Sequence, residues 1–210
     1  MTNHLNAGSQ RRTPTRKGWV VSTIGVLTIA LGLFAAMATP AGARASNFRT
    51  RQDVMEQGGG GTYQDDGATL LRRRDSIRIK WRVATPEPGS YLYPTADQIP
   101  PGSPPHPPVQ AGSPEVFTLW AFVFNHPDQC TAPCGMDDIV TDTGADGGIY
   151  QLDATVAKGQ RIVMKGTINQ GQAPALGSPL TNIDGAEVHV AMAPHGQAHS
   201  GADLARQMVG

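Results

Sequence analysis

The sequence lacks the features by which enzymes are most readily recognised. Aromatic residues make up 6% of the chain, charged residues 16%, and only 2 of 210 residues are cysteine. The G-x-S-x-G, P-loop, H-E-x-x-H and dinucleotide-binding patterns do not occur. These absences leave the enzyme class open but remove its most recognisable members, so we expect a non-enzymatic protein. Glycine (25) and proline (17), together 42 of 210 residues, are abundant instead.

Acidic residues are missing from residues 1–45, where the charged residues are Arg11, Arg12, Arg16, Lys17 and Arg44. The apolar run 19–38 follows the basic stretch, and Ala43 and Ala45 form an A-x-A cleavage site. This order is typical of a bacterial secretory signal, with cleavage after Ala45 or Ala43. The alternative is an uncleaved anchor, with membrane contact through residues 19–38. Either form predicts an exported protein, secreted or anchored in the cell envelope, with residues 46–210 outside the cytoplasm.

Few apolar residues occur between the leader and residue 68. Residues 46–67 are polar and contain four consecutive glycines at 58–61, which predicts a flexible tether. Residues 68–200 are expected to form the folded domain, and residues 201–210 a C-terminal tail. Ten of the 17 prolines lie in residues 85–114, which therefore predict a surface insertion rather than a strand.

Long helical patterns are also missing from the predicted domain, and its apolar segments are typical of strands. Residues 77–83 alternate apolar and basic side chains, and residues 117–124 are continuously apolar. Further strands are expected at 68–73, 149–156, 161–168 and 186–192, separated by turn residues. The pattern predicts a mainly β domain, an antiparallel β-sandwich or a small barrel. We expect the basic residues of 72–82 to form a solvated strand face that resists edge pairing.

The two cysteines, Cys130 and Cys134, are close in sequence. In an exported protein such a pair predicts a disulfide that stiffens a turn. The alternative is a metal-binding or redox pair that holds copper or zinc, with His126, His189 and His195 as candidate ligands.

A second group of polar residues could form a site if the fold brought its members together. Glu187 and His189 share one face of a strand, and Asp137 and Asp138 lie in a glycine-rich loop. Their convergence would provide a polar or acid–base site, as in a hydrolase. The simpler expectation is a hydrogen-bonded histidine and an ordinary solvated acidic loop.

Three stretches carry a resemblance: RRRDSIRIKWRVATPEPGSYLYP, FTLWAFVFNHPDQCTAPCGMDD and GAEVHVAMAPHGQ. Together they resemble a group of uncharacterised exported bacterial proteins, mainly from actinobacteria, over roughly residues 62–198. The resemblance implies export and one β-rich domain, and it implies no activity, cofactor, partner or catalytic residue.

The function expected from these observations is that of a non-enzymatic binding or structural module of the cell envelope or extracellular space. Its partner, not identified by the sequence, would be an envelope component or another protein. Residues 46–210 carry 12 basic and 17 acidic residues, and this excess of acid, together with export, disfavours nucleic acid. The alternative function is a small metal-binding or redox protein.

Overall fold

The computed structural model describes residues 48–56, 61–88, 90, 113–131, 133–141 and 143–209. The predicted leader and most of the proline-rich insertion lie outside these residues. In the described part of the chain no helix has the length and apolar character needed to cross a bilayer.

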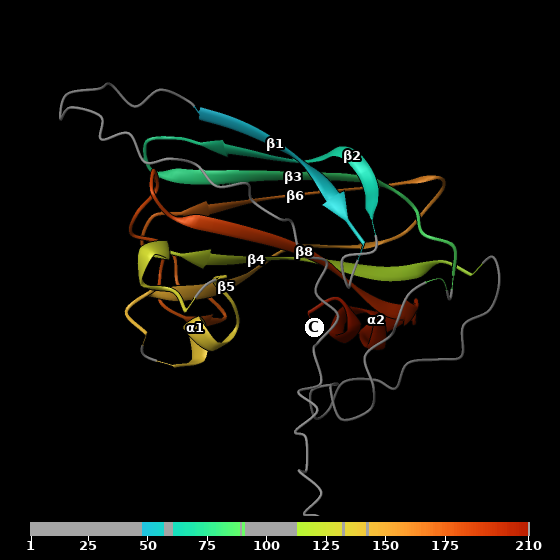
Figure 1. Cartoon of the computed structure of the whole chain (residues 1–210). Helices are drawn as coiled ribbons and strands as arrows, with labels where there is room; N and C mark the ends of the chain where they lie inside the picture. The colour runs from blue at the N-terminus through green and yellow to red at the C-terminus, as the bar shows by residue number, and fades with distance from the viewer. Residues whose placement is uncertain are drawn as a thin grey trace, which may run out of the picture.

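The domain is a sandwich of two antiparallel four-stranded sheets (Figure 1). The first sheet has the order β1 (Phe48–Met55), β2 (Thr62–Arg72), β3 (Ser76–Ala84) and β6 (Arg161–Asn169). The second has the order β7 (Leu176–Gly177), β5 (Gly147–Val156), β4 (Glu115–Phe124) and β8 (Glu187–Gln197). The sheets do not close on each other, so the prediction of a sandwich is confirmed and that of a barrel is wrong.

The core lies between the sheets and follows from the alternation of side chains along the strands. In β3 the apolar residues Ile77, Ile79, Trp81 and Val83 are buried, while the intervening residues are exposed. Opposite them, the odd-numbered residues 117–123 of β4 enter the same apolar cluster. Burial of this continuous apolar layer is the main source of stability, at about 25 cal/mol per Å² removed from water. Strand β4 lies between β5 and β8, the central position that its apolar sequence predicts.

Three short helices accompany the sheets: η1 (Pro127–Gln129), α1 (Asp137–Val140) and α2 (Gly201–Gln207). Figure 1 shows α1 and α2 on the outer side of the second sheet. Helix α2 is fastened by Gln207, which is 5% exposed and donates from Nε2 to the carbonyls of His195 (2.7 Å) and Gln197 (2.9 Å). These hydrogen bonds join the helix near the end of the chain to the sandwich.

The predicted tether is wrong over most of its length, because residues 48–55 form strand β1 and residues 62–67 are the first part of strand β2. This strand buries few side chains, with Val54 fully buried, and is ordered by backbone pairing to β2 from Phe48↔Arg72 to Met55↔Thr62. Composition alone does not predict such a strand, because the backbone hydrogen bonds that order it need no apolar side chains. Glycines 58–60 lie outside the described residues.

The basic residues of β3 are exposed as predicted, but not for the predicted reason. Strand β3 pairs with β2 on one side and β6 on the other, so it is not an edge strand. Arg72 departs further from the prediction, since its guanidinium is partly buried and donates to the carbonyls of Ile183 and Ala186. Burial lowers the pKa of Arg72.

Candidate functional site

A cleft opens at one end of the sandwich, where three separate segments of the chain meet. It is lined by residues 85–88 after β3, residues 113–115 and Phe117 at the start of β4, and residues 157–160 between β5 and β6. Its volume is about 520 Å³, which is within the range of small-molecule sites. Two backbone hydrogen bonds hold the segments together: Thr85 donates to the Gln160 carbonyl (2.9 Å), and Ala157 donates to the Glu115 carbonyl (2.7 Å).

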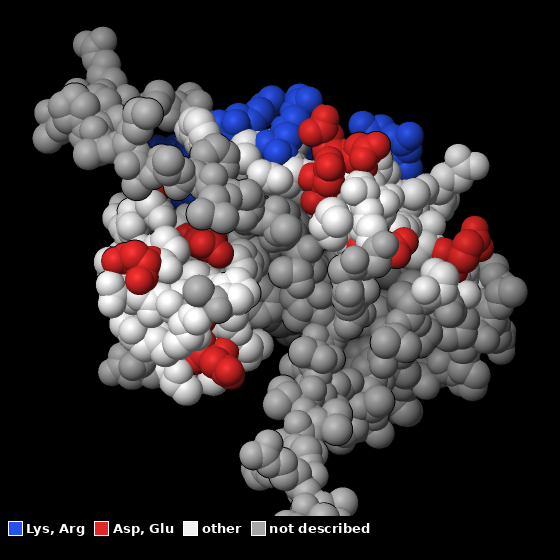
Figure 2. Space-filling model, viewed as in Figure 1, with Lys and Arg blue, Asp and Glu red and all other residues white. Residues whose placement is uncertain are grey.

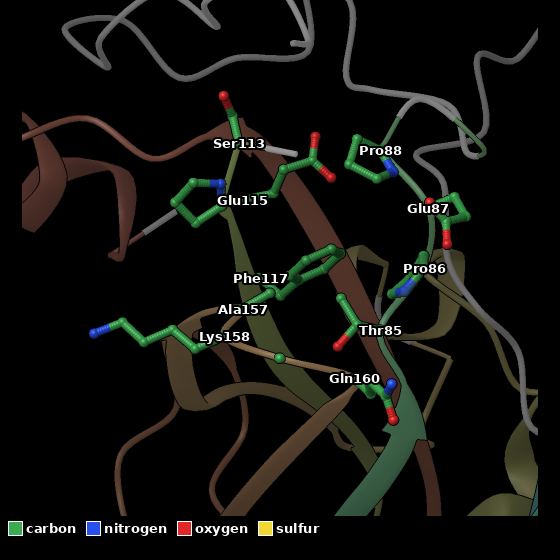
Figure 3. Close-up of a pocket in the computed structure, with 12 residues that line it drawn as sticks. Thr85, Pro86, Glu87, Pro88, Ser113, Glu115, Phe117, Ala157, Lys158 and Gln160 are labelled. Atoms are coloured by element: carbon green, nitrogen blue, oxygen red, sulfur yellow. The ribbon is translucent and has the colours of Figure 1, made fainter. Parts of the chain in front are cut away.

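The lining of the cleft is mixed: its prolines, Ala157 and Phe117 are apolar, and its polar groups include the carboxyl groups of Glu87 and Glu115. Figure 3 shows the carboxylate of Glu115 and the ring of Phe117 directed toward the side where Pro86 and Pro88 lie. Glu115 is only 3% exposed and Phe117 only 1%. Burial raises the pKa of Glu115, because the charged form loses hydration. A partly desolvated acid beside an aromatic ring can accept strong hydrogen bonds from a ligand cation.

Further polar residues line the cleft, and Thr85 and Lys158 are two of them. The hydroxyl oxygen of Thr85 is buried and has no hydrogen-bond partner within the described part of the chain, so its donor and acceptor are not used there. Lys158 is on the rim, and Figure 3 shows its side chain extending away from Glu115 and Phe117. Apart from Lys158, the ionisable residues that line the cleft are Glu87 and Glu115, which are both acidic.

Cys130 and Cys134 form a disulfide with an S–S distance of 2.05 Å, as predicted. The bond lies between η1 and α1, at the opposite end of β4 from the cleft. Cys134 is buried in a small apolar cluster with Phe124 and Ala145. Both sulfurs are bonded to each other, so in this state they offer no thiolate to a metal.

Asp138 organises the loop around the disulfide, although the sequence predicts a solvated acidic loop. Its side chain is buried, and its oxygens accept hydrogen bonds from the Thr131 N–H (3.0 Å), the Thr131 hydroxyl (3.1 Å) and the Gly135 N–H (2.9 Å). These bonds, above all that from the Thr131 N–H, lower the pKa of Asp138. The prediction is wrong for Asp138 and correct for Asp137, which is exposed.

Glu187 and His189 do come together, with 2.5 Å between Glu187 Oε1 and His189 Nε2. The His189 ring packs edge-on against Phe124, with 5.4 Å between centroids. Among the described residues no hydrogen bond or ion pair joins this pair to Asp137 or Asp138. The predicted four-residue polar site is therefore divided into two separate structures.

The remaining histidines lie apart. His195 Nε2 is 2.7 Å from the Thr118 hydroxyl, which also accepts from the Trp120 indole N–H at 2.8 Å. His126 Nε2 is 3.6 Å from an Asp146 carboxylate oxygen, at a largely exposed position. Over the described ranges no three His, Cys, Asp or Glu side chains are placed to hold one metal ion. The candidate copper or zinc ligands His126, Cys130, Cys134, His189 and His195 are thus not assembled into a site.

The residues of the cleft were not singled out from the sequence. Phe117 and Glu115 belong to the central strand, where an apolar run predicts core, and Thr85 and Gln160 lie far from it in sequence. The one available signal was the pair of proline-rich boundaries near residues 85 and 114, which mark where the chain leaves and rejoins the sandwich. No protein-family model, curated protein or solved structure matches the chain.

Proposed function

We propose that the protein is an exported, non-enzymatic binding module of the cell envelope or extracellular space, and that its ligand cleft is the one lined by Glu115 and Phe117. The observation that carries the proposal is the buried Glu115 carboxyl beside Phe117 at a cleft of about 520 Å³ whose lining is partly apolar and partly polar. Apolar clefts with a few polar groups are typical of ligand sites. The leader, with its basic stretch, apolar run and A-x-A site, supports export.

The ligand class follows from the groups that face the cleft. Glu115 is a carboxyl, Thr85 offers a hydroxyl, and Phe117 with the neighbouring prolines supplies apolar contact. An amine attached to a small apolar body fits all three, because the ammonium group pairs with the carboxylate and the body packs on the ring. A bound cation favours the ionised form of Glu115. Affinity should therefore fall as the pH drops through the pKa of Glu115, which burial has raised.

A matched pair of probes tests the cleft. Calorimetric titration should show that 2-phenylethylamine binds about tenfold more tightly than 2-phenylethanol, because only the amine makes a charge-assisted bond. Glu115→Gln should abolish this preference, whereas Lys158→Gln, on the same rim, should preserve it. Equal binding of the two probes, or a preference that survives Glu115→Gln, would contradict the assignment of the cleft.

Export is tested separately, by mass spectrometry of the chain recovered from the envelope and medium of the expressing cell. The mass of the denatured chain reports whether residues 1–45 have been removed. Recovery of the intact chain from the cytoplasm alone would contradict export and leave the cleft experiment unaffected.

A further inference from the structure

The outer face of the first sheet gathers basic side chains from strands that are distant in sequence. Its exposed basic residues, here called the basic face, are Arg49, Arg51, Arg78, Lys80, Arg82, Arg161 and Lys165. Figure 2 shows Lys and Arg concentrated over this side of the molecule, together with a group of acidic residues. Helices α1 and α2 lie on the opposite side of the sandwich (Figure 1).

Strand register explains how the basic residues become neighbours. One row across the sheet reads Arg51↔Thr69, Thr69↔Lys80 and Lys80↔Lys165, which places two lysines directly opposite each other. Paired residues are about 5 Å apart between Cβ atoms, and successive rows about 7 Å apart. The seven basic residues therefore occupy a patch of about 15 by 20 Å.

This arrangement is unfavourable for an isolated domain. Like charges directly opposite on a sheet repel each other, and none of the seven residues forms a salt bridge in the part of the chain that the structure describes. Protection of an edge does not explain the charges of β3, because β3 is an interior strand. An anionic partner over the face would remove the repulsion.

Three acids share the face at one end and reduce its charge without cancelling it. Asp65 and Asp66 line a hollow together with Arg51, Lys80 and Arg82, and Asp53 is fastened by the Asp66 N–H at 2.8 Å. Seven basic residues against three acids leave a formal charge of +4 on this face. Residues 46–210 as a whole carry −5, from 12 basic and 17 acidic residues, so the charge is strongly polarised.

We propose that the basic face docks on the anionic phospholipid headgroups of a membrane. The patch is broad, which fits an extended anionic surface. It includes the half-exposed Val163, opposite Arg82, and the less exposed Leu71, between Arg49 and Arg78. Apolar groups among cations are typical of interfacial membrane contacts. Strand β1 begins ten residues after Ala38, the last residue of the apolar run 19–38. An uncleaved run would hold the face within about 35 Å of the bilayer.

This inference rests on the proposed location in the cell envelope and adds the membrane surface as the partner there. The binding itself can be tested with purified protein. The chain has few lysines, and two of them, Lys80 and Lys165, lie on the basic face, while the exposed Lys158 lies at the cleft. The full chain is reconstituted in vesicles of phosphatidylcholine alone or with phosphatidylglycerol. Acetylation by an uncharged reagent is then followed at each lysine by mass spectrometry.

Phosphatidylglycerol should slow acetylation of Lys80 and Lys165 severalfold and leave Lys158 unchanged, and high salt should remove the difference. Arg51→Gln/Arg82→Gln keeps both reporter lysines and should weaken docking about 25-fold, at the usual contribution of each basic residue near an anionic membrane. The control Arg74→Gln/Arg206→Gln removes two exposed charges elsewhere and should retain protection.

Three results would overturn the proposal. The first is equal acetylation of Lys80 and Lys165 on both vesicle types, and the second is slowing of Lys158 to the same extent. The third is protection by soluble polyphosphate without protection by phosphatidylglycerol vesicles, which would indicate a polymeric anion instead. Each can occur whether or not the cleft binds amines and whether or not export is found.

Discussion

Asn125, at the end of β4, is predicted to be among the most sensitive polar residues of the domain. It is 1% exposed. Its Nδ2 donates to the carbonyls of Asp146 (2.8 Å) and Pro179 (2.9 Å), and its Oδ1 accepts from the N–H groups of Thr181 (2.8 Å) and Asn182 (3.1 Å). These four bonds use the full hydrogen-bonding capacity of the amide. One side chain therefore joins β4 to the segments that precede β5 and β8.

The change Asn125→Ala removes all four bonds and leaves buried backbone groups without partners. At about 1 kcal/mol for each bond, the free energy of unfolding should fall by about 4 kcal/mol. For a domain of this size that corresponds to a decrease in Tm of about 12 °C. Urea denaturation followed by tryptophan fluorescence measures the loss, because Trp81 is fully buried in the core. A loss below about 1 kcal/mol would refute the reasoning, and Asn169→Ala, at an exposed position, is the control.

The change Asn125→Asp separates hydrogen bonding from side-chain size. The new carboxylate keeps the acceptor for Thr181 and Asn182 but faces the carbonyl oxygens of Asp146 and Pro179, so the ionised form is repelled. Its pKa in the folded state should rise above the unfolded value. The variant should then be least stable at neutral pH and recover part of the loss as the pH falls, because a protonated carboxyl can donate one bond. A difference from wild type that does not change with pH would contradict this account.

The remaining predictions concern the disulfide loop. Cys130→Ser/Cys134→Ser should lower the free energy of unfolding by only about 2 kcal/mol, because the closed loop is short. Chemical denaturation measures this loss, and a value above about 4 kcal/mol would contradict the loop-entropy argument. The pKa of Asp138 is lowered in the fold, so its carboxylate stabilises the domain above the unfolded pKa, near 3.9, and this contribution is lost as the pH falls through the folded pKa. Asp138→Asn should therefore be less stable than wild type at neutral pH and approach the stability of wild type below about pH 4. The control Asp137→Asn, at an exposed position, should have the stability of wild type throughout. A difference between Asp138→Asn and wild type that does not change with pH would contradict this account.

Local patterns in the sequence were sufficient to predict the buried face of β3, the central strand and the disulfide. The alternation along residues 77–83 predicts which side chains of β3 are buried, because side chains of a strand point alternately to its two faces. The apolar run 117–124 predicts the central strand β4. The spacing of Cys130 and Cys134 predicts their disulfide. Each of these depends on residues close together in the chain.

Other features could be seen only when distant segments were brought together. Strand β1 is held by pairing with β2 rather than by apolar burial, so its polar composition gives no sign of order. The sequence predicts a solvated acid at Asp138. In the structure, the disulfide turn places the N–H groups of Thr131 and Gly135 within hydrogen-bonding distance of its carboxylate. The candidate metal ligands are plausible in type, but the sandwich places them on different elements.

The amino-acid sequence by itself determined most of the strands, their buried faces, the cysteine pair and the division of charge between residues 1–45 and the rest of the chain. Only the tertiary structure decided that Glu115 and Phe117 line a cleft with Thr85, and that basic residues of β1, β3 and β6 form one face. The physical reason is that periodicity reports the direction of a side chain relative to its own strand. It carries no information about which strands pair, and neighbours across a sheet are set by that pairing.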